Sequence, residues 1–202
     1  MFRVPGNDRR PEITVVVSGS DGIADTPDRS YQDLLDLNDD GRGVFIGSGV
    51  SWLNERTSWR VGAWFRNDDQ DIEGSADDDE LNYGVYGVFG WRSGPNAVNV
   101  RAGMANSGGS AADRFLAVAF QRKTQPGVLG IGVAHTRIAS DFSGRDRDNA
   151  LDSEIYFRVP VFDGRGHVTP SIQYVEVPTV DATDAATGSS AIIAGMRFHW
   201  SF

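Results

Sequence analysis

The sequence predicts an all-β protein: an antiparallel transmembrane β-barrel whose strands follow one another as a meander. Runs of roughly 8–12 residues with alternating apolar and polar side chains recur along the chain, and each run ends at Gly, Asn, Asp or Pro. No stretch reaches the roughly 18–20 consecutive apolar residues that a membrane-spanning helix needs. Glycine and proline, with 24 and 8 residues, also disfavour a helical chain. A strand that is apolar on one face only keeps hydropathy modest, which fits a mean hydropathy of -0.33.

The alternating runs predict about ten strands, most of them close to the roughly 9–11 residues of a tilted membrane strand. We expect them at residues 13–18, 43–53, 57–67, 82–92, 97–105, 114–123, 127–138, 152–161, 167–177 and 190–202. Successive side chains of a strand point to opposite sides, so each strand has one apolar face and one polar or small face. In the last strand we expect these apolar side chains to face outward: Ile192, Met196, Phe198, Trp200 and Phe202.

Two features favour lipid, rather than a protein core, as the contact of the apolar faces. Trp52, Trp59, Trp91 and Trp200 fall near strand ends, where an interfacial aromatic girdle lies in membrane barrels. The connections also alternate between short turns and long polar loops, as periplasmic turns and external loops do. The short ones are at residues 54–56, 93–96 and 125–126, and the long ones at 68–81, 139–151 and 178–189. A soluble β-sandwich that serves as a binding module is the alternative.

The charge and the missing cysteines exclude several classes of function. A formal net charge of -9 disfavours nucleic-acid binding, because neutralising a phosphate backbone needs concentrated Lys and Arg. With no cysteine, the chain forms no disulfide and holds no thiolate metal site. Acidic residues cluster at 67–71 and 77–80, which we interpret as a solvated loop. We expect no catalytic residue, no metal and no cofactor.

The C-terminal half carries a recognisable order of segments. A Tyr-Gly-x-Tyr-Gly strand begins near Tyr83, a Gly-rich strand follows the turn at Pro126, and Glu154-Ile155-Tyr156 comes next. Pro170-Ser171-Ile172-Gln173-Tyr174 and a final Gly195-Met196-Arg197 strand complete the succession. From Tyr83 to Phe202 this order resembles the C-terminal half of the carbohydrate-selective outer-membrane porin family. Val177-Pro178 stands where that family has Asn-Pro, and the tyrosine after Glu154 is closer than in the family pattern.

The resemblance implies a porin of the bacterial outer membrane, in contact with outer-membrane lipid and permeable to small sugars. It implies that residues 1–202 are one domain, the C-terminal portion of a barrel of about sixteen strands, with a signal peptide and further strands upstream. We therefore expect the strand at 13–18 not to pair with the strand at 190–202. The terminal Phe202 resembles the recognition signal of outer-membrane barrels, which implies the barrel-assembly machinery as a partner. A homo-oligomer is compatible with this interpretation.

The polar faces of the strands supply the predicted site. Planar hydrogen-bonding groups suit sugar hydroxyls, aromatic faces suit pyranose rings, and Arg offers a fixed fork of donors. The lumen-lining residues that we expect to contact the permeant are Arg60, Trp64, Arg101, Glu154, Tyr156, Arg158, Gln173 and Arg197, with Arg66 beside them. We further expect these arginines to form a locally positive constriction beneath an acidic mouth.

Three other functions are considered from the residues. The first is a general or ion-conducting porin, which a single-channel measurement with sugar competition would separate from a carbohydrate-selective one. A small outer-membrane lipid hydrolase would use His199 and Ser201, which share one face, although an orienting acid and an oxyanion site are also needed. A calcium loop would start at Asp36, but its twelfth position falls on Gly47 instead of the required glutamate.

Overall fold

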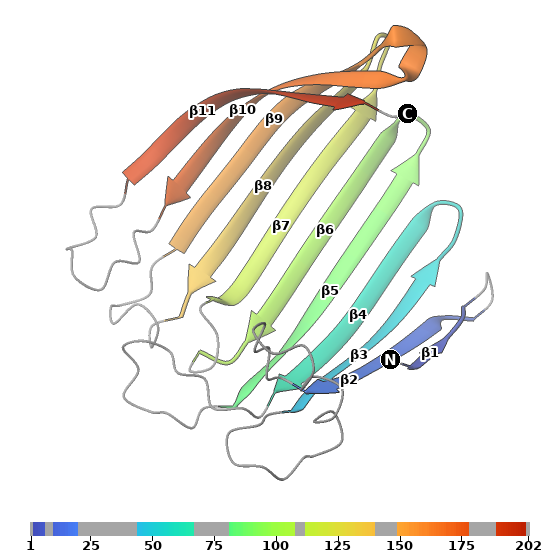
Figure 1. Ribbon diagram of the computed structural model, residues 1–202, viewed down its shortest axis with the longest axis vertical. Coiled ribbons are helices and arrows are strands. Elements are labelled where there is room, and N and C mark those ends of the chain that lie inside the picture. The colour runs from blue at the N-terminus through green and yellow to red at the C-terminus, as the bar shows by residue number, and fades with distance from the viewer. Residues whose placement is uncertain are drawn as a thin grey trace, which may run out of the picture.

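The computed structural model describes residues 2–6, 10–19, 44–66, 81–107, 112–139, 149–177 and 189–200, and in these ranges the chain is almost entirely β-strand. The strands are β1 (Phe2–Val4), β2 (Glu12–Gly19), β3 (Val44–Leu53), β4 (Thr57–Arg66), β5 (Asn82–Ser93), β6 (Asn96–Ala105), β7 (Ala112–Lys123), β8 (Val128–Ile138), β9 (Asn149–Val161), β10 (Gly166–Val177) and β11 (Ser189–Trp200) (Figure 1). A short 3-10 turn, η2 (Phe162–Gly164), joins β9 to β10. No helix in the described ranges has the length and apolar character needed to cross a membrane.

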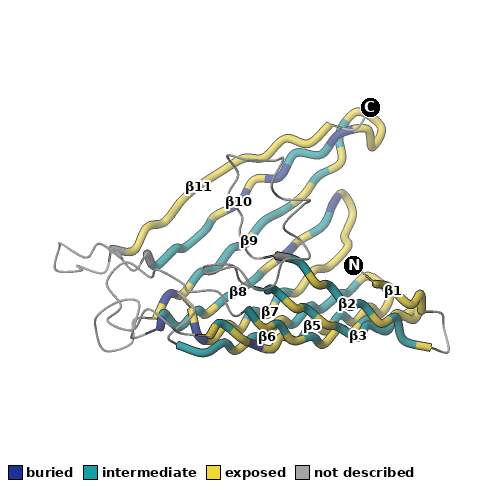
Figure 2. Tube along the Cα trace, turned by 60° about the horizontal axis from the view of Figure 1, so that its bottom comes forward, coloured by how far each residue is buried: buried dark blue, intermediate teal, exposed yellow. Residues whose placement is uncertain are grey.

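The eleven strands form one antiparallel sheet in chain order, which confirms the predicted meander. The sheet is strongly curved and has the shape of an open trough, as the oblique view in Figure 2 shows. Its two edges are β1 and β11, so within the described residues the barrel is not closed. As expected, β2 does not pair with β11. Because a meander reverses direction at every strand, β1 and β11 run in the same direction.

The prediction of about ten strands missed β1. Three residues are too few for a period of two to be recognised in the sequence, so this strand is defined only by its partner. Phe2, Arg3 and Val4 pair with Val15, Thr14 and Ile13 of β2. The predicted bounds of the other strands agree with the structure to within a few residues. Residues 43, 67, 201 and 202, which we also assigned to strands, lie outside the described residues.

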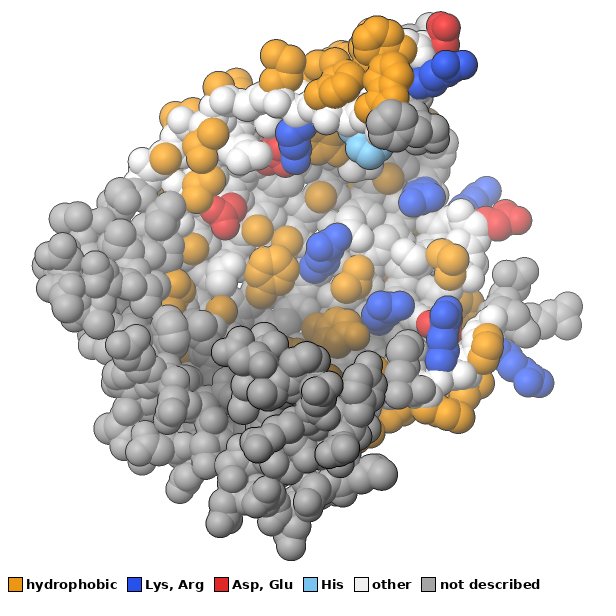
Figure 3. Space-filling model, in the orientation of Figure 1, with side chains coloured by type: hydrophobic (Ala, Val, Ile, Leu, Met, Phe, Trp, Pro, Cys, Tyr) orange, Lys and Arg blue, Asp and Glu red, His pale blue; other side chains and the backbone are white. Residues whose placement is uncertain are grey.

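Register assigns every strand residue to one of two faces, since paired residues of neighbouring strands share a side. Arg60 of β4 pairs with Val88 of β5, which pairs with Arg101 of β6. We call the face that carries these residues the inner face, because it lines the hollow of the trough, and the opposite face the outer face. Figure 3 looks onto the inner face, where charged side chains are scattered over a hollowed surface.

The outer face is apolar and uncovered. In the middle of the sheet its residues are Val61, Val85, Met104, Leu116, Val118, Ile131, Val133, Ile155 and Ile172, each between 46% and 56% exposed. No large side chain of the described residues is fully buried, and the buried apolar residues are just Ala139 and Ala150. A soluble β-sandwich would pack its apolar faces against each other. The described sheet has no such second layer, so that alternative is wrong for these residues.

Four tryptophans lie on the outer face at the end of the trough where the short turns are. Trp52 of β3 is the register partner of Trp59 of β4, and their ring centroids are 6.3 Å apart. Trp91 of β5 is the register partner of Thr57, two residues before Trp59 on β4. Trp200 contacts Phe162 of η2, with ring centroids 5.0 Å apart. The predicted position of these side chains near strand ends is confirmed, and all four lie at the same end. Interfacial aromatic rings of membrane barrels form such a girdle.

Among the outward-facing residues predicted for the last strand, Ile192, Met196, Phe198 and Trp200 do lie on the outer face, by their register with β10. Ile192 and Met196 are 78% and 73% exposed. Phe202 lies outside the described residues. The same holds for the acidic clusters at 67–71 and 77–80, for the start of the calcium-type loop at 36–43 and for Ser201 of the hydrolase alternative.

Replacing Ile131 by Lys should distinguish a lipid-facing from a water-facing outer surface. Ile131 lies on the outer face of β8 between Phe120 and Ile155. Lysine at the middle of a lipid-facing strand destabilises a membrane barrel by about 2–4 kcal/mol. The control is Ala134→Lys, three residues along the same strand on the inner face and opposite Asp152, which should change stability by less than about 0.5 kcal/mol. Equilibrium urea unfolding in phospholipid vesicles measures both, and equal effects would contradict a lipid-facing outer surface.

Candidate functional site: the inner face of the trough

All eight predicted lumen residues lie on the inner face. Arg60 and Trp64 come from β4, Arg101 from β6, Glu154, Tyr156 and Arg158 from β9, Gln173 from β10, and Arg197 from β11. Their shared side follows from the register of the strand pairs: Glu154 pairs with Gln173, which pairs with Ile193, four residues before Arg197 and on the same face. Arg60 and Trp64 form a first group around one hollow, and Arg101, Glu154 and Gln173 form a second group around another. Tyr156 and Arg197 belong to a network of polar contacts that includes Glu154 or its neighbours on β9. Arg158 lies on the inner face but lines neither hollow.

The first group surrounds a hollow of about 590 Å³ between β2 and β5. Arg60, Trp64 and Tyr86 contribute the long side chains of its wall, together with Arg3 and Glu12. Arg3 donates a hydrogen bond to Glu12 at 2.6 Å, which also makes an ion pair. Trp64 donates from its indole nitrogen to Asn82 at 3.1 Å, so the ring is held in place. The hollow therefore combines fixed aromatic surface with charged groups.

The second group surrounds a hollow of about 450 Å³ between β6 and β10. Small residues form its floor on the inner face: Ala117, Ala119, Gly132 and Ala134. Arg101, Glu154 and Gln173 stand around that floor, with Asn99 and Phe115. Arg101 donates to Asn99 at 3.0 Å. Three predicted residues from three different strands thus line one hollow, which their positions in the sequence did not reveal.

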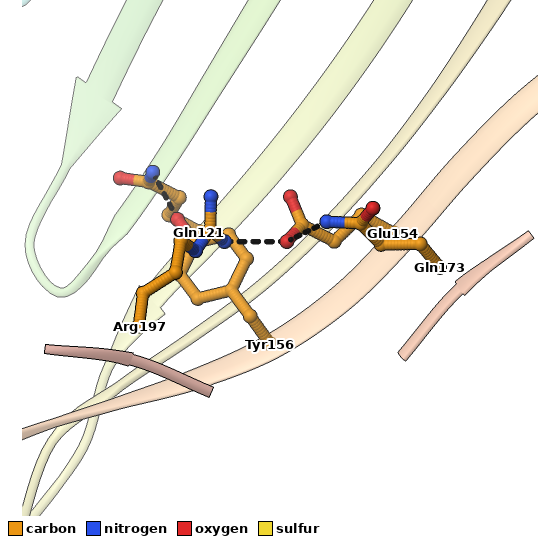
Figure 4. A network of polar contacts seen from close by, with 5 residues as sticks. All are labelled: Gln121, Glu154, Tyr156, Gln173 and Arg197. Atoms are coloured by element: carbon orange, nitrogen blue, oxygen red, sulfur yellow. Dashed lines mark hydrogen bonds and ion pairs between the residues drawn. The ribbon is translucent and has the colours of Figure 1, made fainter. Parts of the chain in front are cut away.

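A network of polar contacts connects β7, β9, β10 and β11 (Figure 4). Glu154 lies at its centre: Gln173 donates to its Oε1 at 3.0 Å, and Arg197 forms an ion pair with the same carboxylate. Tyr156 accepts a hydrogen bond from Gln121 at 2.5 Å. The two contacts of the Glu154 carboxylate are charge-assisted and therefore stronger than the neutral Gln121–Tyr156 hydrogen bond, so they fix Glu154, Gln173 and Arg197 beside the hollow.

Positive charge predominates on the inner face. At its register positions the described strands carry eight basic and three acidic side chains, a net charge of +5 in a chain whose formal net charge is -9. The basic ones are Arg3, Arg60, Arg66, Arg92, Arg101, Lys123, Arg158 and Arg197, and the acidic ones are Glu12, Asp152 and Glu154. Three of the basic residues are held by the contacts described above. Within a low-dielectric passage such charges act strongly on ions.

Three aromatic rings on the inner face lie over glycines of the neighbouring strand. Tyr86 pairs with Gly62, Trp64 with Gly84, and Tyr156 with Gly130. A Cβ atom added at Gly62 would lie 2.6 Å from the Tyr86 ring, and one added at Gly84 would overlap the Trp64 ring. The missing side chains therefore let the rings lie down along the sheet, an arrangement that protects exposed glycine backbone in β-sheets. Flat rings leave the hollow open.

Several side chains of the site were not predicted. Gln121, Tyr86 and Asn99 belong to the hollows or to the network, and the register places all three on the inner face. The Tyr-Gly-x-Tyr-Gly pattern gave a signal for Tyr86. Gly84 lies two residues before it, on the same face of the strand, and has no side chain to cover the tyrosine ring. Gln121 had none, since its partner Tyr156 is 35 residues away.

Comparisons with known proteins agree with this architecture. No protein-family model matches the chain, and no curated protein matches it in sequence. Among solved structures, the high-pH structure of Pseudomonas putida OprB is similar, with a TM-score of 0.67 and 12% sequence identity over 95% of this chain. The match spans 56% of that chain. The chain therefore has an OprB-type porin fold, and it spans a little over half the length of that porin.

The glycine beneath Trp64 should be sensitive to a single methyl group. In Gly84→Ala the new Cβ would overlap the Trp64 ring and lie 2.6 Å from the Met104 carbonyl oxygen, so we expect a loss of about 1–3 kcal/mol. The matched control is Gly87→Ala on the outer face of the same strand, where the nearest atom is 3.9 Å away. That change should be neutral or stabilise by up to about 1 kcal/mol. Urea midpoints measured in detergent micelles test the pair, and equal midpoints would contradict the packing of Trp64 on Gly84.

Proposed function

We propose that this chain forms part of the wall of a water-filled channel in the bacterial outer membrane, through which small carbohydrates diffuse. The observation that carries the proposal is the separation of the two faces. The outer face exposes large apolar side chains across the whole sheet, and the inner face exposes arginines, carboxylates and amides. An apolar band outside and a polar lumen inside are the arrangement of transmembrane β-barrels. The OprB-type fold supports the same conclusion.

The wall needs more strands than the eleven described. Because β1 and β11 run in the same direction, an all-antiparallel closure requires an odd number of further strands between them. Five would complete the barrel of about sixteen strands that the family resemblance implies. The tryptophan end, where the short turns lie, would face the periplasm, and the long loops would face outward.

Passage would need no covalent step and no cofactor. A sugar would exchange hydrogen bonds with water for transient ones to Arg101, Gln173 and Arg158, while Trp64 and Tyr156 offer flat apolar surface to the ring carbons. Each contact replaces a hydrogen bond to water, so its net contribution is small, and a permeant is released as readily as it binds. Size exclusion by the hollows and the residual positive charge would set what passes.

Removing two arginines should change ion selectivity. We expect Arg101→Ala combined with Arg158→Ala to lower the preference for anions over cations, because both charges lie on the inner face. Arg122→Ala is the control, since Arg122 lies on the outer face of β7 opposite Leu129. Reversal potentials in planar bilayers under a salt gradient measure the shift. A double variant that matches wild type would leave both arginines as ordinary solvated side chains.

Sugar contact has its own test in Trp64. Trp64→Ala should weaken the block of ion current by added sugars several-fold, because stacking surface is lost while the charges are kept. Trp59→Ala is a matched control on the same strand, with its ring on the outer face. Single-channel recordings with graded glucose, maltose and sucrose measure the block. Unchanged sugar block in Trp64→Ala, or no block of wild type by any sugar, would instead favour the general porin.

A further inference from the structure

Two of the three histidines of the chain face each other across the last pair of strands. His167 of β10 and His199 of β11 are register partners, one residue from Gly166 and Trp200 at the ends of those strands. Their ring centroids are 6.4 Å apart and the rings are tilted by 38°. Both are on the inner face, at the end of the trough where η2 makes its turn. His199 is exposed and His167 half-buried.

We propose that His167 and His199 together bind a divalent transition-metal ion, with Cu²⁺ favoured over Ni²⁺ and Zn²⁺. Neutral imidazole is a good ligand for all three ions, and affinity rises toward copper. Bonds of about 2.0–2.1 Å from each ring nitrogen to one ion would bring the rings somewhat closer than their centroid separation of 6.4 Å. The contact recorded for the His199 ring is with His167, and His199 is exposed, so a small turn of its side chain toward His167 need not break a described hydrogen bond.

The surroundings make this an open, exchangeable site. The described residues contain no group of three or more metal-ligating side chains, so water would fill the other coordination positions. On the inner face, Thr169 and Arg197 are the next residues along the two strands, and Pro160 of β9 faces His167. Arg197 is paired with Glu154, which lowers its repulsion of a cation. Asp163 and Arg165 of the adjoining turn are exposed charges of opposite sign.

Each imidazole would coordinate the ion through a ring nitrogen that carries no proton, so metal binding and protonation exclude one another at that atom. A bound ion would add positive charge at one rim of the inner face.

The three histidines allow a clean test. The full chain in detergent micelles is titrated with CuCl₂, and binding is followed by calorimetry and by electron paramagnetic resonance. We expect one site per chain with nitrogen hyperfine structure from two imidazoles. His167→Ala and His199→Ala should each weaken binding at least about tenfold and reduce the hyperfine pattern to that of one nitrogen. His135→Ala should stay within about twofold of wild type, because His135 lies on β8 and faces outward.

The outcomes separate binding by the pair from other causes. Circular dichroism shows whether each variant keeps its sheet, and His199→Gln serves as a second variant that preserves side-chain size. Equal weakening by His135→Ala, or wild-type affinity and spectrum in His167→Ala, would overturn the proposal. The measurement involves no transport, so it stands or fails independently of the channel function.

Discussion

The constraint on which this protein depends is the register of its antiparallel strands, which determines the face of the sheet on which each side chain lies. Between β1 and β11 every strand pairs with a neighbour on both sides, so most of the backbone polar groups are satisfied within the sheet. A chain in a lipid environment requires such pairing, because no water is present to satisfy those groups. The same ladder sends alternate side chains to opposite faces. A shift of one residue in any pairing would move arginines into the apolar face and isoleucines into the hollow. Every property of the site is therefore a consequence of register.

Within this constraint the inner face is organised by pairs of unequal size. Aromatic rings lie on the glycines of adjacent strands, so Trp64, Tyr86 and Tyr156 add surface without filling the trough. Elsewhere the floor is alanine and glycine, and the polar network around Glu154 stands above it. Large side chains opposite each other would have closed the same space. The hollows thus result from pairing large residues with small ones across strands.

One irregularity lies at the loop end of β7 and β8. The pairing shifts between Ala112 and Arg114, and Asp113 occupies the extra position. Its carboxylate is almost fully buried and accepts a hydrogen bond at 2.5 Å from Arg137 of β8, with which it forms an ion pair. A bulge of this kind increases local twist and ends regular pairing. The charged pair therefore terminates the apolar outer face at that end of the two strands.

The sequence by itself determined the strand class, the two faces of the strands that alternate clearly and the placement of Trp52, Trp59, Trp91 and Trp200 near strand ends, because a period of two is a local property of the chain. It placed Arg60, Arg101 and Glu154 on one side for the same reason. Consecutive strands were expected to be neighbours in a meander, but only the tertiary structure decided the register of each pairing. Side-chain contacts between residues distant in sequence follow from that register. The β1 strand, the Gln121–Tyr156 hydrogen bond and the opposition of His167 to His199 are examples. Their partners are set by the ladder and not by any pattern within a single strand.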